Sequence, residues 1–320
     1  MSLKCVILDD YQNIALQMAE WSLISNEVEI SSINEHIDNE DELVTAIKDY
    51  EIIIIMRERT PFPASLLNRL PNLKLLITSG MRNASIDLKT ATNLGITVCG
   101  TSSSSEPPTE LNWALILGLA RNIKKESQSL TSNGPWQSTV GTDLYGKRLG
   151  LIGLGKIGSR MARIGKAFGM EVMAWSQNLA QERTEELGVE RAESLEELLT
   201  ASDFVSIHLV LSDRTRNLIG EKELQFMKPD AFLINTSRAA IINQMDLITA
   251  LKNNWIAGAG LDVYEEEPLP ENHNFRELPN VLALPHLGYV TRTNYETYYS
   301  EAVENIVAFL KGEPKRVLNT

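Results

Sequence analysis

The feature that most constrains the fold is a glycine-rich hexapeptide, GLGKIG, which contains Gly153, Gly155 and Gly158. The apolar run KRLGLI precedes it and SRMARIGKAF follows it, so it lies between a predicted strand and a predicted helix. In this context the glycines permit a tight turn, a close approach to a pyrophosphate and close helix packing. The first amides of the helix also bind anions. The segment is therefore predicted to bind a dinucleotide.

The next predicted strand, EVMAW (171–175), ends without the acidic residue that commonly binds the adenosine ribose. Ser176, Gln177 and Asn178 follow instead, and no arginine flanks this strand end. Neutral side chains neither repel nor neutralise a 2′-phosphate, and Lys156 lies nearby in the glycine motif. The cofactor is therefore predicted to be NAD(P), with the choice between NAD and NADP left open.

Strands and helices alternate along the chain, and the short apolar strands fall into two groups. The first group is predicted at 5–8, 28–33, 51–56, 73–78 and 96–98, and the second at 147–152, 171–175, 204–209, 231–236, 257–263 and 281–285. Apolar strands separated by helices are typical of α/β folds with parallel sheets covered on both faces.

A polar, proline-containing segment, TSSSSEPPT (101–109), separates the two groups and is predicted to be a linker where the chain passes from one domain to the other. An apolar helix is predicted after it at 111–123. The final helix, 291–310, carries one apolar stripe at helical spacing. We expect this helix to return to the first group of strands.

Composition excludes several classes of protein. The formal net charge is -12 and no Lys/Arg run is present, which argues against nucleic-acid binding. There is no apolar stretch of about 18 residues and no secretory signal, so neither a membrane span nor export is expected. Cys5 and Cys99 fall in predicted strands and favour buried free thiols in the cytoplasm. No paired His/Cys spacing indicates a metal site.

Polar residues follow three later strands: Arg238 in INTSRAAI, Asp262 and Glu267 in GLDVYEEEP, and His286 in LPHLGYVT. Open α/β sheets bind ligands at this edge. Singly, each has an ordinary explanation as a solvated cation, an acidic turn or a structural histidine. Together, an arginine that can bind a carboxylate and a histidine that can exchange a proton beside a carboxylate suit reversible reduction of a 2-oxo acid.

GLGKIG, SDFVSIHLVLSDRTRNLI, INTSRAAI, LDVYEEEP and PHLGYVT, in this order, resemble the D-isomer-specific 2-hydroxyacid dehydrogenase family over nearly the whole chain. The resemblance implies an α/β protein of two Rossmann-like domains that flank a cleft. A flavodoxin-like substrate domain would span 1–100 and 289–320, and an NAD(P)-binding Rossmann domain 101–288. The implied reaction reduces a small 2-oxo acid to a D-2-hydroxy acid, with glyoxylate and hydroxypyruvate as the first substrates to test.

The resemblance also implies roles for individual residues. His286 would be the general acid in reduction, Glu267 its partner, and Arg238 the residue that binds the substrate carboxylate and polarises the C2 carbonyl. Asp262 would face the nicotinamide carboxamide. The implied cofactor contacts are Gly153, Gly155, Lys156, Ile157, Gly158, Ser176, Leu209, Thr236, Ser237, Asp262 and Gly288.

In the N-terminal domain, ITSGMRNASID (77–87) aligns with the substrate loop of the family, with Met81, Arg82 and Asn83 in place of its common glycine-rich form. Arg57 is a candidate second carboxylate contact, and a surface arginine after a strand is the equal alternative. Tyr289 stands where many relatives carry Gly or Ala, so its bulk would narrow the pocket.

Homodimerisation is implied as well, because residues 110–145 resemble the dimer arm of the family and Trp136 resembles a position that reaches the partner's pocket. A dinucleotide-sensing regulator is the alternative function, since related corepressors bind the cofactor and partner proteins. Formate dehydrogenases of this fold typically have Gln in place of Glu267, which counts against their chemistry. His208 is either a cofactor-facing residue or a satisfied core residue.

Overall fold

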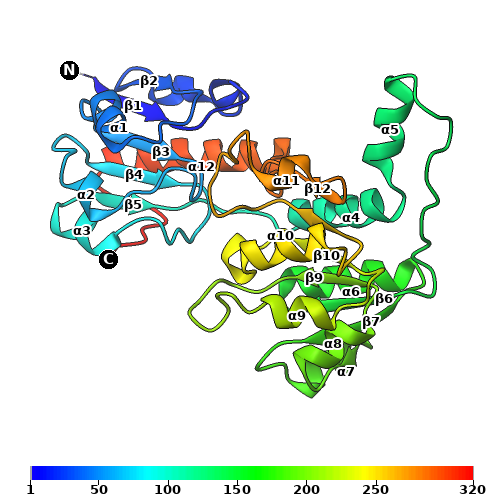
Figure 1. Cartoon of the computed structure of the whole chain (residues 1–320). Helices are drawn as coiled ribbons and strands as arrows, with labels where there is room; N and C mark the ends of the chain where they lie inside the picture. Colours follow the sequence, from blue (N-terminus) through cyan, green and yellow to red (C-terminus); the bar gives the residue numbers. More distant parts are fainter. Residues whose placement is uncertain (1, 320) are drawn as a thin grey trace. The chain divides into compact units, whose positions relative to one another are not determined.

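The computed structural model describes residues 2–319 and divides the chain into two compact units. Unit 2 is Ser105–Tyr289, and unit 1 combines the residues up to Ser104 with those from Val290 onward. The predicted divisions were after residues 100 and 288. In Figure 1 the red and orange helix α12 (Arg292–Leu310) lies beside the blue and cyan strands of unit 1.

Unit 1 contains a five-stranded sheet. Its strands are β1 (Leu3–Ile7), β2 (Val28–Ser32), β3 (Ile52–Ile55), β4 (Leu75–Thr78) and β5 (Thr97–Cys99). They are ordered β2-β1-β3-β4-β5, and every pairing is parallel. This is the flavodoxin-like order, in which the chain reverses direction across the sheet between β1 and β3.

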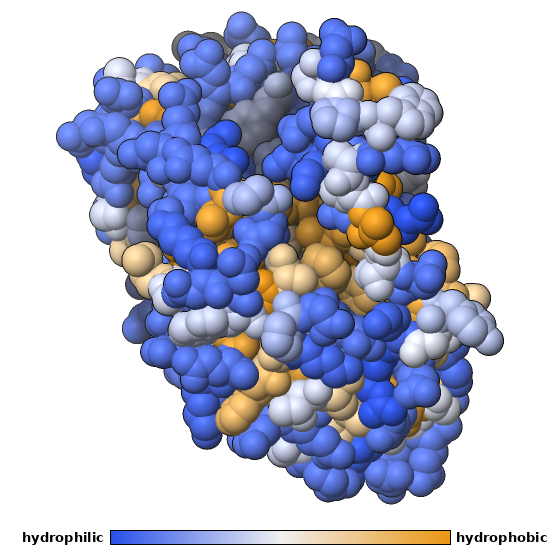
Figure 2. Space-filling model, turned by 45° about the vertical axis from the view of Figure 1, so that its right-hand side comes forward, coloured by the Kyte–Doolittle hydropathy of each residue, from blue (hydrophilic) through white to orange (hydrophobic). Residues whose placement is uncertain are grey.

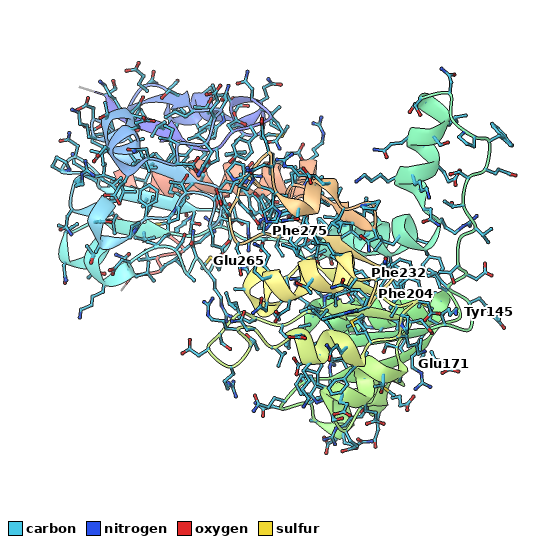
Figure 3. The ribbon with its side chains drawn as sticks, in the orientation of Figure 1. Tyr145, Glu171, Phe204, Phe232, Glu265 and Phe275 are labelled. Atoms are coloured by element: carbon cyan, nitrogen blue, oxygen red, sulfur yellow. The ribbon has the colours of Figure 1, made fainter. Side chains whose placement is uncertain are left out.

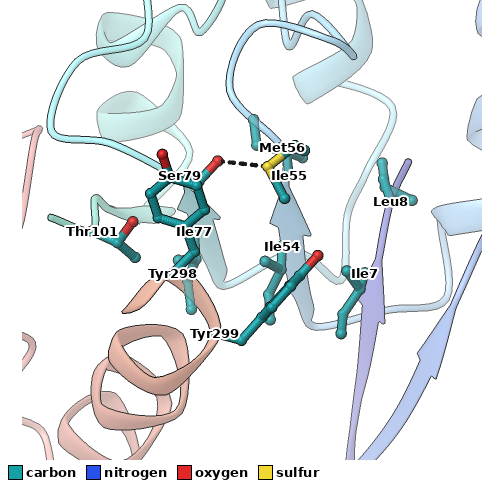
Figure 4. Close-up of a pocket in the computed structure, with 10 residues that line it drawn as sticks. All are labelled: Ile7, Leu8, Ile54, Ile55, Met56, Ile77, Ser79, Thr101, Tyr298 and Tyr299. Carbon is teal, nitrogen blue, oxygen red and sulfur yellow. Dashed lines mark hydrogen bonds between the residues drawn. The ribbon is translucent and has the colours of Figure 1, made fainter. Parts of the chain in front are cut away.

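Helices cover both faces of this sheet. Ile53 and Ile55 of β3 pack in one core with α1 (Glu40–Ile47), α2 (Ala64–Leu67) and α3 (Leu88–Asn93). Ile54 points the other way, as alternation along a strand requires, and lies with Tyr298 and Tyr299 of α12 (Figure 4). The short 3-10 helices at Ala15–Gln17 and Trp21–Ile24 complete this layer.

Unit 2 contains a seven-stranded sheet. Its strands are β6 (Arg148–Ile152), β7 (Glu171–Trp175), β8 (Glu190–Arg191), β9 (Phe204–Ile207), β10 (Phe232–Asn235), β11 (Gly258–Leu261) and β12 (Val281–Ala283). They are ordered β12-β11-β10-β9-β6-β7-β8, again with parallel pairings throughout. Two all-parallel sheets confirm the predicted α/β class. The order reverses between β6 and β9, which is where such sheets bind dinucleotides.

Two apolar cores sandwich the sheet of unit 2. One includes residues of α4 (Glu106–Ala120), α6 (Lys156–Ala167) and α7 (Gln181–Leu187). The other includes residues of α8 (Leu195–Ala201), α9 (Glu221–Phe226), α10 (Gln244–Lys252) and α11 (Asn274–Glu277). Phe204 and Phe232 stack on neighbouring strands with ring centroids 5.4 Å apart (Figure 3).

Several predicted boundaries were wrong. Helix α4 begins at Glu106, inside the expected linker, because Pro107 and Pro108 fall in its first turn, where a missing N–H breaks no helical hydrogen bond. It ends at Ala120, and Asn122, with φ of 51°, precedes a separate helix, α5 (Ile123–Thr131). Strand β9 stops at Ile207, so His208 and Leu209 lie beyond its end.

Hydrophilic side chains predominate on the face of the molecule drawn in Figure 2, in keeping with the net charge of -12. Within residues 2–319, no helix has the length and apolar character needed to cross a membrane. In the same range, no group of three or more His, Cys, Asp and Glu side chains is arranged to hold a metal ion.

Candidate active site

The carboxyl edge of the unit 2 sheet gathers most of the predicted site residues. Because all strands are parallel, the loops that follow them meet at one edge. In sheet order from β7 to β12, these loops carry Ser176, the glycine turn, Leu209, the segment Thr236–Arg238, the segment Asp262–Glu267, and His286. The predicted nucleotide and catalytic residues therefore lie along one line of loops.

The glycine turn has the geometry that a dinucleotide site needs. Gly153 has φ of 105°, and a Cβ there would lie 2.6 Å from the carbonyl oxygen of His208. A Cβ on Gly158 would collide with the carbonyl of Gly153, so both positions require glycine. A Cβ on Gly155 would meet no atom, and this residue is exposed at the start of α6. The open space above Gly155 and the free helix start fit a pyrophosphate.

The side chains of His286 and Glu267 form a close polar pair in the site. The Nδ1 atom of His286 lies 2.6 Å from Oε2 of Glu267, and both side chains are largely buried. The other carboxylate oxygen of Glu267 accepts a hydrogen bond from the backbone N–H of Tyr264 at 2.9 Å. This contact orients the carboxylate toward the imidazole and leaves Nε2 of His286 as the ring nitrogen opposite it.

Asp262 organises the loop that carries His286. Its two carboxylate oxygens accept hydrogen bonds from the backbone N–H groups of Leu287 and Gly288 at 2.7 and 2.8 Å. Burial raises the pKa of Asp262 to about 6, although those two N–H groups and His286 act in the opposite direction. A side chain expected to face the cofactor thus also holds the loop that carries His286.

The backbone of His286 is in the left-handed region, with φ of 54°, which is uncommon for a residue other than glycine. The ring of Tyr289 stands edge-on to the imidazole, with centroids 5.5 Å apart and planes at 71°. Tyr289 is buried. The imidazole is therefore bounded by Glu267 at Nδ1 and by an aromatic ring at its side.

Arg238 follows β10, and its loop is fixed by side chains around it. Asn235 Nδ2 donates to the carbonyl oxygen of Arg238 at 3.0 Å, while Asn235 Oδ1 accepts from the Ser237 N–H at 3.0 Å. Ser237 Oγ donates to the carbonyl of Leu209 and so joins the loops after β10 and β9. The Nη1 atom of Arg238 donates to the Ser237 carbonyl at 2.8 Å.

A buried polar chain lies beneath these loops, and most of it was missed by the sequence interpretation. Asn112 of α4 donates to Thr236 Oγ1 at 2.7 Å and accepts from Ser206 Oγ at 2.8 Å. Ser206 Oγ lies 3.0 Å from Nε2 of His208. Burial lowers the pKa of His208 to about 3, so its ring is neutral. An asparagine inside an otherwise apolar helix was the available signal for this chain.

At the other end of the line, the backbone N–H of Gly153 donates to the carbonyl of Trp175 at 2.8 Å, which brings the end of β7 beside the glycine turn. Ser176 follows, partly exposed. Arg183 of α7 donates to Ser159 Oγ of α6 at 2.7 Å and pairs with Glu186 at 2.6 Å. The contact of Arg183 with α6 joins residues 24 apart in sequence, so the sequence gives no sign of it.

In unit 1, the predicted substrate residues follow neighbouring strands β3 and β4. Arg57 has φ of 53°, and its backbone N–H donates to Ser79 Oγ at 3.0 Å. Asn83 is buried, and its Nδ2 donates to the carbonyl of Arg57 at 2.6 Å. Met81 and Arg82 are exposed at the tip of the loop. Asn83 therefore has a different environment from its two neighbours.

Comparisons with known proteins agree with this architecture. Residues 113–288 match the family model described as D-isomer specific 2-hydroxyacid dehydrogenase, NAD binding domain. A glyoxylate reductase of Aeropyrum pernix is 43% identical over 265 residues, which cover 79% of this chain and 78% of the relative. The chain belongs to the D-isomer-specific 2-hydroxyacid dehydrogenase family, as its motifs predict.

Two solved structures extend the comparison to nearly the whole chain. A phosphoglycerate oxidoreductase of Vibrio cholerae is 36% identical, with a TM-score of 0.91 over 97% of this chain and 99% of that one. A D-lactate dehydrogenase of Aquifex aeolicus, solved with NAD and lactic acid, is 28% identical, with a TM-score of 0.78 over 97% and 96%. The protein is an NAD(P)-dependent oxidoreductase.

Proposed function

We propose that the protein reduces a small 2-oxo acid to the D-2-hydroxy acid. The observation that carries this proposal is the contact of 2.6 Å between His286 and Glu267 at the sheet edge that also holds the glycine turn and Arg238. A histidine whose Nδ1 is bonded to a carboxylate keeps Nε2 available for proton transfer.

The chemistry follows from the residues. When bound at this edge, a reduced nicotinamide would supply a hydride for C2 of the oxo acid. Protonated His286 donates its Nε2 proton to the C2 oxygen, and Glu267 stabilises the imidazolium beforehand. Arg238 binds the substrate carboxylate and polarises the carbonyl, because a guanidinium presents paired N–H donors to carboxylate oxygens. The product is a 2-hydroxy acid, and the imidazole is left neutral until it takes up a proton from solvent.

The order of the loops supports one orientation of the cofactor. The adenosine end would lie at Ser176 after β7, the pyrophosphate at the glycine turn after β6, and the nicotinamide toward β11 and β12. The remaining predicted contacts, Lys156, Ile157, Leu209, Thr236, Ser237, Asp262 and Gly288, belong to the same loops. Ser176 cannot repel a 2′-phosphate, and Arg183 on α7 would supply a cation for it by exchanging its ion pair with Glu186. We therefore expect NADPH to be used at least as well as NADH.

Glyoxylate and hydroxypyruvate are the substrates that we propose first. The matched Aeropyrum pernix relative is a glyoxylate reductase. The buried ring of Tyr289 beside His286 also favours a small group on C2. Arg57, Met81 and Arg82 are proposed substrate-side residues from unit 1. Because reduced glyoxylate is achiral, the D configuration has to be tested with hydroxypyruvate or pyruvate.

We also propose a homodimer. Helix α5 has no buried residue, and Trp136 and Val140 in the following segment are 79% and 96% exposed. Large apolar side chains in such positions are typical of a surface that a second copy covers. The two cysteines are buried and unbonded, which supports a place in the reducing cytoplasm.

The deciding experiment measures initial rates of NADH and NADPH oxidation with glyoxylate, hydroxypyruvate, pyruvate and phenylpyruvate, followed by chiral analysis of the products. Turnover with a D product from hydroxypyruvate or pyruvate supports the proposal. Tight cofactor binding without turnover of any oxo acid would contradict it and favour a dinucleotide-sensing regulator. Sedimentation of the purified protein tests the dimer.

A further inference from the structure

Arg57 has an unusual backbone for a residue proposed to contact substrate. Its φ of 53° lies in the left-handed region, where a Cβ approaches the carbonyl oxygen that follows it. This conformation is unfavourable for a non-glycine residue, so the surrounding structure has to enforce it. The contacts that enforce it identify the residues that aim Arg57.

Side chains of the loop after β4 bind the backbone of Arg57 at both ends. Ser79 Oγ accepts a hydrogen bond from the Arg57 N–H at 3.0 Å, and Ser79 itself is held by donation to Met56 Sδ at 3.2 Å (Figure 4). Asn83 Nδ2 donates to the Arg57 carbonyl at 2.6 Å. The backbone N–H and C=O of Arg57 are therefore both taken by the neighbouring loop.

Asn83 is in turn held rigidly. Its Nδ2 also donates to Thr78 Oγ1 at 2.9 Å, while its Oδ1 accepts from the N–H and the hydroxyl of Ser85 at 2.9 and 2.6 Å. An amide side chain has two donor hydrogens and two acceptor lone pairs, and these four contacts use all of them. Asn83 is only 8% exposed. It is thus equipped to hold Arg57 and has no hydrogen-bonding group left for a substrate.

The side chain of Arg57 is directed as well. Its Nη1 lies 3.2 Å from the position that a Cβ of Gly80 would occupy, so the guanidinium rests against the loop at Gly80. Burial raises the pKa of the Tyr298 hydroxyl, and the charge of Arg57 and a hydrogen bond with it act in the opposite direction. Tyr298 of α12 and Gly80 thus border the guanidinium that Asn83 aims from the backbone.

We propose that Asn83 is a positioning residue that acts through Arg57 and does not itself contact the substrate. By fixing the left-handed backbone, its amide aims the guanidinium of Arg57 at the carboxylate of a 2-oxo acid. This inference rests on the proposed function of Arg57, and it replaces the direct substrate contact expected of Asn83 from the sequence.

The test is a double-mutant cycle on KM for glyoxylate and hydroxypyruvate with Arg57→Ala, Asn83→Ala and the double variant. We expect each single variant to raise KM at least about tenfold, which corresponds to the roughly 1.4 kcal/mol of one weakened charged contact. The double variant should match Arg57→Ala, because a residue that acts only through Arg57 has no effect once Arg57 is gone. Cofactor KM should not change.

Two controls keep the outcome clear. Asn83→Ser serves if Asn83→Ala fails to fold, because serine retains a small polar group. Asn83→Asp replaces the donor amide with a charged carboxylate that cannot donate, and Asn68→Asp introduces the same charge at an exposed site, the C-cap of α2, where the Asn68 amide donates to the Ala64 carbonyl. Asn83→Asp should raise KM, whereas Asn68→Asp should behave as wild type.

The possible failures are distinguishable. If Arg57→Ala leaves KM unchanged, the proposed role of Arg57 is wrong. If Arg57→Ala raises KM but the effects of the two substitutions multiply in the double variant, Asn83 acts independently and the inference is wrong. A crystal structure of Asn83→Ala gives a readout without turnover: Arg57 should leave the left-handed region, and an unchanged φ would also overturn the proposal.

Discussion

The Arg57 loop of unit 1 and the His286 loop of unit 2 solve one structural problem with different chemistry. Each places a basic residue on left-handed backbone after a parallel strand, with φ of 53° and 54°. Neutral groups, Ser79 and Asn83, hold Arg57, whereas two carboxylates, Asp262 and Glu267, hold His286. The groups that bind the Arg57 backbone are uncharged and suit a permanent cation, whose Nε also lies 3.6 Å from Glu58 Oε2. The arrangement around His286 can change charge with its histidine, as proton transfer requires.

The largest expected effect is a loss of kcat on substitution of His286, whereas substitution of Arg57 should change KM. His286→Ala should lower kcat about 10²–10⁴-fold, the usual contribution of a general acid, with little change in cofactor affinity. Arg57→Ala should act mainly on KM. Steady-state kinetics with glyoxylate, together with cofactor titration by fluorescence, checks both. If kcat of His286→Ala equals that of wild type, the proton comes from another group, and the difference in role between the His286 and Arg57 loops is wrong.

Asp262→Asn tests whether the His286 loop needs a carboxylate to hold its backbone, as the Arg57 loop does not. An amide can accept only one of the two N–H bonds from Leu287 and Gly288, and an unmet buried donor costs about 1–3 kcal/mol. We expect kcat to fall by about tenfold as His286 loses its alignment with Glu267. Asn243→Asp, at a helix cap distant in sequence from this loop, serves as a control of similar size. Wild-type turnover in Asp262→Asn would show that the loop carrying His286 keeps its conformation without the Asp262 carboxylate.

The same carboxylate should make unit 2 respond to pH. The pKa of Asp262 is raised to about 6, so the stability that this group contributes is present below its ordinary pKa of about 4 and is lost as pH rises through about 6. The difference in unfolding free energy between wild type and Asp262→Asn should therefore change between pH 4 and 6, by up to about 3 kcal/mol, and be flat above. Urea titrations across this range measure it; a flat difference throughout would contradict the shifted pKa.

The smallest expected effect concerns the cofactor. Ser176→Asp should move the preference toward NADH by repelling the 2′-phosphate, and Arg183→Gln should weaken use of NADPH by a few-fold more than use of NADH. The ratio of kcat/KM for the two cofactors measures both. Lys222→Gln, on α9, controls for loss of a surface charge. Unchanged ratios would place the adenosine ribose away from the end of β7.

The class of fold and the catalytic candidates could be predicted because they depend on local patterns. Apolar strands and a glycine turn can be recognised from the sequence pattern. Parallel strands then bring the loops that follow them to one edge of the sheet, whatever lies between the strands. Arg238, Asp262, Glu267 and His286 were placed by that rule.

The remaining features depend on contacts between distant segments. The sequence around Arg57 and His286 does not indicate a left-handed backbone, because Ser79, Asn83 and Asp262 impose it from other loops. The contact of Arg183 with Ser159 joins two helices in the same way. The start of α4 was misjudged because a proline can either end a helix or occupy its first turn, and composition does not separate the two.

The return of α12 to unit 1 has a consequence for synthesis on the ribosome. Unit 2 is one uninterrupted segment, Ser105–Tyr289, so all of its strands are synthesised before α12. Unit 1 has to wait: Ile7, Ile54 and Ile77 face Tyr298 and Tyr299 of α12, and Val98 pairs with Leu318. The unit that is translated first is thus the one completed last, and its uncovered sheet face is the surface that a nascent-chain chaperone would protect in the interval.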